Sequence, residues 1–201
     1  MNADVDAAVD ALDRGDVVVI PTETVYGLAA RLDRPAAIEK IFALKERAAE
    51  KVLQVLVFDA TWLAKLGEPS SGAIRVATGC WPGPLTLVVR AREGVPAAAT
   101  RGGTVGIRVP DHPLARAVIG RAGPLAASSA NLAGRPTPPR PDEIRTLFGD
   151  RVAVYLDGGE IAAGGSTVLD VSGGEPRLVR EGPLPFAHVR ALYAGSRFER
   201  G

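Results

Sequence analysis

Short apolar runs alternate along this chain with stretches of helical periodicity, and this alternation constrains the fold most. Glycine and proline stand between many of the segments, where they end helices and open turns. We expect helices at residues 5–12, 35–45, 70–79, 112–121 and 186–194, and strands at residues 16–20, 52–58, 85–89, 104–109, 124–127, 152–156, 166–171 and 177–180. Because the late strands follow one another without a helix between them, the pattern predicts an α/β domain with a mixed sheet.

Length and composition exclude several classes of protein. The 201 residues fit one domain, residues 1–201, with a real hydrophobic core. A zinc site usually needs about four ligands, and Cys80, His112 and His188 are one short, so we expect no metal held by side chains. No run approaches the roughly 20 apolar residues of a membrane span, and the N-terminus is acidic where a signal peptide is basic. With one thiol, which suits a reducing compartment, we expect a cytoplasmic protein that does not contact membranes.

Charge is distributed unevenly, although the net charge is only +1. Residues 75–140 hold nine arginines against two carboxylates, a balance of +7, whereas the first 60 residues have a balance of −4. Such a division fits a protein with a cationic concavity for an anion better than a protein with a uniformly basic face for nucleic acid. The alternative is that arginine is simply abundant, since 20 of the 24 basic residues are arginine, and charge alone does not separate the two.

Polar residues follow the first expected strand directly. Thr22, Glu23 and Thr24 come after residues 16–20, and ligands in open α/β sheets bind beyond the carboxyl ends of strands. The same threonines also suit a turn in which their hydroxyls bond to the local backbone.

Three cations lie near the end of the helix expected from residue 35. If that helix ends near Lys45, then Lys45 and Arg47 share one side of an extended segment and converge on one anion, with Lys51 within reach. Cations at this place also neutralise the negative end of a helix, which is the alternative interpretation.

Two further strands carry groups suited to binding a small ligand. Thr104, Gly106 and Arg108 share one face of a strand, and an arginine there can grip a carboxylate or phosphate with two hydrogen bonds. Arginine on an exposed strand face is also ordinary. Residues 127–131 are small and polar at the end of another strand, so a ligand can approach the backbone closely. The chain has no G-x-S-x-G elbow, Walker A sequence or G-x-G-x-x-G, which argues against a serine hydrolase and against those nucleotide-binding loops.

Eight segments between residues 21 and 183 together resemble the YrdC/Sua5 family of L-threonylcarbamoyladenylate synthases: PTETVYGL, the K-x-R pair, VLQVLV, WPGPLTLVV, GTVGIRVPDHP, SSAN, STVLD and LVREGP. The resemblance implies a YrdC-like fold, a twisted mixed sheet flanked by helices with a ligand cleft at the strand ends. It implies ATP, L-threonine and bicarbonate as substrates, and threonylcarbamoyl-AMP and pyrophosphate as products. Downstream transferase proteins would place the threonylcarbamoyl group on adenosine 37 of tRNA.

The resemblance also implies which residues bind and react. The threonine-binding positions match Thr24, Arg108, Ser166 and the backbone at Ala127. The ATP-binding positions match Arg47, Lys51, Thr104, Ser129, Thr137 and Arg180. The family's catalytic Lys-Arg-Ser-Asn set matches Lys45, Arg47, Ser129 and Asn131. Val52 stands where the family usually has proline, which bears on the placement of Lys51.

The implied reaction depends on positioning and cations more than on side-chain proton transfer. The threonine amine takes up CO₂, and the carboxylate so formed attacks the α-phosphorus of ATP and expels pyrophosphate. Arg108 would hold the threonine carboxylate, while Mg²⁺ is expected mainly through the ATP phosphates, because that ion keeps waters and asks for few protein ligands. No residue is an obvious base for the amine.

Two other functions stay open. An RNA-binding module would use the arginines of residues 75–140, but Trp81 is the only aromatic residue there on which a base could stack. The related domain of hydrogenase-maturation proteins suggests a carbamoyl-transfer module, although those chains are much longer and carry zinc-finger-like and acylphosphatase-like segments. The chain is similar to the short YrdC type rather than to the longer Sua5 type.

Overall fold

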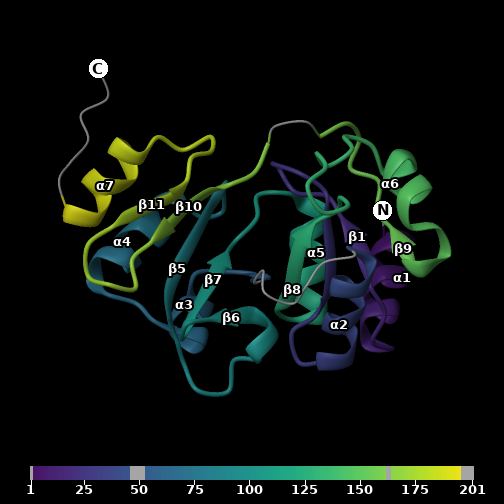
Figure 1. The fold of residues 1–201 in the computed structure, drawn as a ribbon, viewed down its shortest axis with the longest axis horizontal. Coiled ribbons are helices and arrows are strands. Elements are labelled where there is room, and N and C mark those ends of the chain that lie inside the picture. The colour runs from purple at the N-terminus through teal and green to yellow at the C-terminus, as the bar shows by residue number, and fades with distance from the viewer. Residues whose placement is uncertain (1, 46–52, 162–163, 196–201) are drawn as a thin grey trace.

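A mixed β-sheet runs across the width of the molecule, from β11 on one side to β9 on the other (Figure 1). The computed structural model describes residues 2–45, 53–161 and 164–195. The main strands lie in the spatial order β11 (Arg177–Arg180), β10 (Thr167–Asp170), β5 (Leu85–Ala91), β7 (Thr104–Arg108), β3 (Gln54–Leu56), β8 (Leu125–Ser129), β2 (Gly27–Arg31), β1 (Val18–Ile20) and β9 (Val154–Tyr155). The short strands β4 (Gly67–Glu68) and β6 (Thr100–Arg101) pair with β5 and β7. The pairs of β10 with β5, β3 with β7 and β1 with β9 are parallel, so the expected mixed α/β architecture is confirmed.

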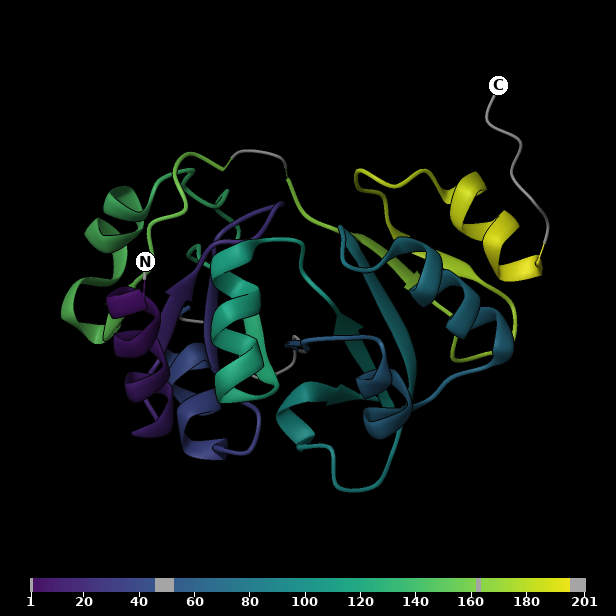
Figure 2. The same cartoon turned by 180° about the vertical axis from the view of Figure 1, so that it is seen from behind.

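Helices cover both faces of the sheet. On one face α1 (Asn2–Asp13) and α5 (Pro113–Ala122) pack side by side and bury Val18 and Leu125 (Figure 2). The other core takes Val19 and Ile107 together with residues of α2 (Pro35–Leu44), α4 (Ser71–Cys80) and α7 (Phe186–Ala194). Val18 and Val19 enter different cores because successive side chains of a strand point to opposite faces.

Local chemistry explains where several helices begin. α2, α5 and α6 (Pro141–Phe148) have a proline in the first turn, where its missing N–H costs no hydrogen bond. α4 is capped by Ser70, whose Oγ accepts a hydrogen bond from Ala73 N at 3.2 Å. None of the described helices has the length and apolar character needed to cross a membrane.

The five expected helices and eight expected strands all occur, with small shifts at their ends. Three sizeable elements were missed: β2, α3 (Thr61–Leu66) and α6. The strand β2 has the sequence GLAAR, and glycine and alanine are uncommon in strands, so only its burial between β1 and β8 explains it. α6 follows a proline-rich stretch directly, and Pro141 is the first residue of the helix.

Candidate functional site

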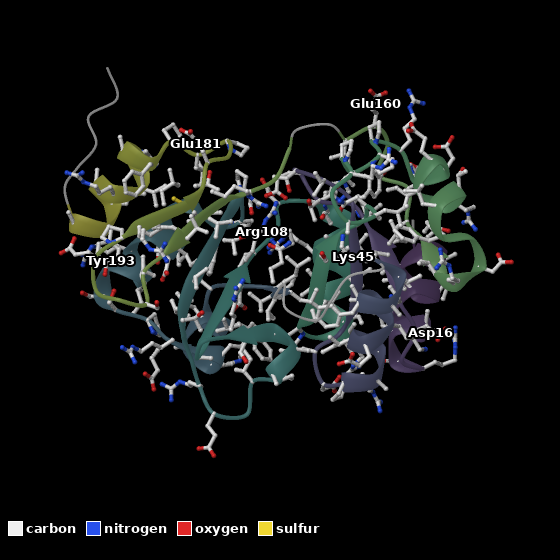
Figure 3. The ribbon with its side chains drawn as sticks, viewed as in Figure 1. Asp16, Lys45, Arg108, Glu160, Glu181 and Tyr193 are labelled. Carbon is white, nitrogen blue, oxygen red and sulfur yellow. The ribbon has the colours of Figure 1, made fainter. Side chains whose placement is uncertain are left out.

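Arg108, the last residue of β7, lies near the centre of the molecule (Figure 3). It is 1% exposed, and its Nη2 donates to Thr24 Oγ1 at 2.9 Å and lies 2.9 Å from Glu23 Oε1. The second oxygen of Glu23 accepts a hydrogen bond from Asp111 N at 3.1 Å. Burial lowers the pKa of Arg108, and the carboxylate of Glu23 opposes that shift. Arg108 Nε is buried and has no hydrogen-bond partner among the described residues, so one donor of the guanidinium is unsatisfied.

The threonines between β1 and β2 shape the loop that meets Arg108. Thr22 Oγ1 donates to Val25 O at 2.6 Å and accepts hydrogen bonds from Thr24 N and Val25 N, which closes a local turn. Thr24 Oγ1 lies 3.0 Å from Thr22 Oγ1, and since the Thr22 proton goes to Val25, Thr24 donates to Thr22 and accepts from Arg108. The turn interpretation therefore holds for Thr22, and Thr24 belongs with Arg108.

Lys45 follows α2 directly, which confirms that the helix ends there, and its side chain reaches the segment after β8. Its Nζ donates to Asn131 O at 2.9 Å, to Asn131 Oδ1 at 3.0 Å and to the carbonyl oxygen of Ser129. An ammonium has three N–H donors, and these three oxygens match them. Because Lys45 is 1% exposed, a phosphate oxygen would have to displace one of these partners to reach it.

Ser166 and Arg180 form a third cluster, at the start of β10 and the end of β11. Arg180 Nε donates to Ser166 O at 2.9 Å, and Arg180 Nη2 donates to Ser166 Oγ at 3.0 Å. A Cβ atom at Gly165 would lie 2.8 Å from Arg180 Cζ, so a glycine is needed for this close approach. Burial lowers the pKa of Arg180 most, and the charge of Arg108 lowers it further, because the two guanidinium groups lie near each other.

Strand directions alone do not bring these clusters together. β1 and β8 both run antiparallel to β7 in the sheet, so the loop after β1 leaves from the edge opposite the end of β7. The contacts of Arg108 with Thr24 and Glu23 show that this loop nevertheless reaches the end of β7. The twist that accumulates over several strands allows such an approach. The three clusters lie at or next to strand ends and come from both edges of the sheet.

Two expected site residues lie in strands away from the cluster around Arg108. Thr104, Gly106 and Arg108 do share one face of β7, but Thr104 begins the strand, roughly 13 Å before Arg108 at the usual rise per residue. Its Oγ1 donates to Arg101 O at 2.7 Å. Ala127 is buried in β8, opposite Gln54 of β3.

Three more expected residues lie in loops or beyond the described chain. Thr137 is half-buried in the loop between β8 and α6. Arg47 and Lys51, and with them Val52, lie outside the described residues. The convergence of Lys45 with Arg47 therefore stays a prediction.

Two polar side chains that the sequence did not point to, the buried Thr86 and the half-buried Gln54, connect to Ser166. Thr86 Oγ1 donates to Gln54 Oε1 at 3.1 Å and lies 2.8 Å from Ser166 Oγ. Each interrupts an apolar run, VLQVLV for Gln54 and LTLVV for Thr86. A polar residue inside a buried strand is the signal that would have found them.

Other titratable groups give no metal site in the described part of the chain, where no three His, Cys, Asp or Glu side chains gather to hold an ion. His112 precedes α5, and burial lowers its pKa although Glu23 and Asp111 pull it upward. Two surface hollows of about 500 and 490 Å³ lie elsewhere, one along α7 and one beside Trp62 and Lys65. Neither is lined by residues of the three clusters.

Known proteins share this sequence and fold over most of the chain. A threonylcarbamoyl-AMP synthase of Chromohalobacter salexigens is 39% identical over 181 residues, which cover 84% of this chain and 92% of that protein. The Bacillus subtilis protein of the same name is 36% identical over 195 residues, which cover 94% of this chain and 56% of that protein. The structure of Pyrococcus abyssi Sua5 complexed with L-threonine matches with a TM-score of 0.89 at 36% identity, covering 94% of this chain and 56% of that chain.

The family assignment rests on the extent of these matches. The chain spans about half the length of the B. subtilis and P. abyssi proteins but nearly all of the C. salexigens protein. The sequence model of the Sua5/YciO/YrdC family, described as "Telomere recombination", matches residues 10–182, which include all three clusters. The chain therefore belongs to the Sua5/YciO/YrdC family.

Proposed function

We propose that this chain makes threonylcarbamoyl-AMP from L-threonine, bicarbonate or CO₂, and ATP, and releases pyrophosphate. Two relatives are named for that product, and a third was solved with L-threonine. The observation that carries the proposal is the buried guanidinium of Arg108, which has an unpartnered Nε and whose charge acts on a second, more exposed arginine, Arg180. Such a site suits a substrate with one carboxylate beside a polyphosphate.

Arg108 is suited to bind the carboxylate of L-threonine. Its Nη2 already lies against the carboxylate of Glu23, and its Nε–H is available for another. An arginine holds a carboxylate in a fixed plane, and a charged hydrogen bond in a buried site is strong. We assign Thr24, Ser166 and the backbone at Ala127 to the rest of the threonine site.

The reaction then needs two bond-forming steps. The neutral threonine amine forms a bond to the carbon of CO₂ and loses a proton, which gives an N-carboxylate. An oxygen of that carboxylate attacks the α-phosphorus of ATP, the bond from this phosphorus to the β-phosphate oxygen breaks, and pyrophosphate leaves. Both steps gather negative charge, so positioning and fixed cations supply most of the acceleration.

We assign the phosphates of ATP to the neighbourhood of Arg180 and of Lys45 with Ser129 and Asn131. Arg180 is oriented by its two hydrogen bonds to Ser166, and Lys45 places a buried positive charge on Asn131 Oδ1, which also accepts from the Ser129 hydroxyl. The likeness to the family adds four more positions to the proposed ATP site: Arg47, Lys51, Thr104 and Thr137.

A magnesium ion would be held mainly by the ATP phosphates. The described residues form no group of three ligands for a metal, and Mg²⁺ commonly keeps its waters and binds through substrate phosphates. When bound, it would neutralise charge on the departing pyrophosphate.

An RNA-binding module without catalysis is the alternative, and the basic stretch supports it weakly. Two of its arginines form ion pairs: Arg121 pairs with Asp6 and Arg140 pairs with Glu160. Pairing of this kind reduces the positive potential that a phosphate backbone would meet. We propose that any contact with tRNA is secondary to catalysis.

We also propose that residues 1–201 act as one domain in the cytoplasm. Its product would be passed to transferase proteins that modify adenosine 37 of tRNA. A mixture of the chain, those proteins and unmodified tRNA should yield the modified nucleoside only when threonine and bicarbonate are present.

Pyrophosphate release with each substrate omitted in turn tests the proposed function. We expect release only when ATP, L-threonine and bicarbonate are all present, and release that ignores threonine would contradict the proposal. Chromatography with labelled threonine and labelled bicarbonate should show both labels in one adenylate. Arg108→Ala should abolish threonine-dependent pyrophosphate release at ordinary threonine concentrations, whereas Arg190→Ala, at an exposed position of α7, is the matched control.

A further inference from the structure

We propose that Thr86 and Gln54 are positioning residues that fix the direction of the Ser166 hydroxyl, so that Ser166 can meet the substrate only as a hydrogen-bond acceptor. The inference rests on the proposed function, in which Ser166 belongs to the threonine site. It follows from the donors and acceptors of four hydrogen-bonded side chains, which lie on β3, on β5, directly before β10 and at the end of β11.

The direction of the chain is set at Thr86. A hydroxyl has one proton to donate, and Thr86 Oγ1 donates it to Gln54 Oε1 at 3.1 Å. The contact of 2.8 Å between Thr86 Oγ1 and Ser166 Oγ must then use the proton of Ser166. Ser166 Oγ also accepts a hydrogen bond from Arg180 Nη2 at 3.0 Å. Each group therefore donates to the next: Arg180 donates to Ser166, Ser166 to Thr86, and Thr86 to Gln54.

Packing holds Thr86 in the orientation that this chain requires. Gly106 of β7 lies beside the Thr86 methyl group, since a Cβ atom at Gly106 would be 3.3 Å from Thr86 Cγ2. With its methyl group against Gly106, Thr86 turns its hydroxyl toward Gln54 and Ser166. Both Thr86 and Ser166 are buried, so water does not compete for these hydrogen bonds.

The consequence concerns which substrate groups Ser166 can recognise. Its proton is used by Thr86 and one lone pair by Arg180, which leaves one lone pair of Oγ for a ligand. That lone pair accepts a hydrogen bond from an N–H or O–H group of the substrate and repels a substrate atom that is itself an acceptor. In L-threonine the donors are the amine and the β-hydroxyl, whereas the carboxylate is directed to Arg108.

Thr86→Val tests this directly, because valine keeps the shape of threonine and removes only the hydroxyl. Ser166 then loses its acceptor and can turn its proton toward the substrate. We expect KM for L-threonine to rise about tenfold, the factor that corresponds to one lost charged hydrogen bond. We expect kcat and KM for ATP to change by less than about twofold. Thr86→Ser, which restores the hydroxyl, should recover most of the threonine KM.

Other measurements keep the inference falsifiable. Gln54→Met removes the final acceptor without touching Ser166, and it should raise KM for L-threonine in the same direction. If Thr86→Val folds poorly, the KM of Gln54→Met for L-threonine tests the inference in its place. An unchanged threonine KM in both variants, or an equal rise for threonine and ATP, overturns the inference.

Substrate analogues identify the donor that Ser166 accepts. L-2-Aminobutyrate has the amine of threonine but no hydroxyl. If Thr86→Val weakens it as much as threonine, the amine is the donor, and if the penalty disappears, the β-hydroxyl is the donor. A wild-type protein without threonine-dependent pyrophosphate release would refute the proposed function. Calorimetric binding of L-threonine to wild type and Thr86→Val would still test the inference separately.

Discussion

Arg108→Lys is the change that examines the threonine site most directly. It keeps a positive charge beside Glu23, but an ammonium cannot present the flat pair of donors that arginine offers to a carboxylate. In the structure Nη2 is shared between Thr24 and Glu23, and Nε has no hydrogen-bond partner among the described residues. One charged hydrogen bond contributes about 1.5–3 kcal/mol, or a factor of roughly 10 to 150 in affinity. We expect KM for L-threonine to rise within that range.

The assay is the initial rate of pyrophosphate release with L-threonine varied and ATP and bicarbonate saturating. Arg190→Lys makes the same exchange on the exposed face of α7 and should match wild type. An unchanged threonine KM in Arg108→Lys would refute the assignment of the carboxylate to Arg108. An equal rise for threonine and ATP would show a general distortion of the site instead.

Three further predictions concern stability and reactivity. Lys45→Met removes three hydrogen bonds from a buried ammonium to Ser129 and Asn131 and should lower the free energy of unfolding by about 3 kcal/mol. Lys40→Met at an exposed ion pair should cost less than about 1 kcal/mol, and equal losses by urea denaturation would contradict this. Burial lowers the pKa of His112 below its unfolded value, so its contribution to stability is present above about pH 6.5 and is lost as the pH falls. His112→Gln should therefore flatten the fall of the melting temperature between about pH 7 and pH 5. Burial raises the pKa of the Cys80 thiol, so its alkylation should be slower in the folded protein than in urea, and equal rates would contradict this.

Local patterns in the sequence were enough to predict the class of fold. Each expected helix and strand follows from apolar spacing and from glycine or proline at its ends, which act within a few residues. The strand β2 was not predicted because its residues have weak strand preference and pair only when β1 and β8 are in place. The pairing of β5 with β10 joins residues 85–88 to residues 167–170, and no local pattern specifies such a partner.

The sequence by itself determined that Thr24, Arg108, Ser166 and Arg180 are site candidates, because polar residues at the ends of buried strands and their family motifs are visible one segment at a time. Only the tertiary structure decided how they are used. It turned Arg108 toward Thr24, 84 residues away, gave the three donors of Lys45 to backbone and amide oxygens, and joined Gln54 and Thr86 to Ser166. The physical reason is that hydrogen bonds form over about 3 Å, and the order and twist of the whole sheet decide which distant side chains come that close.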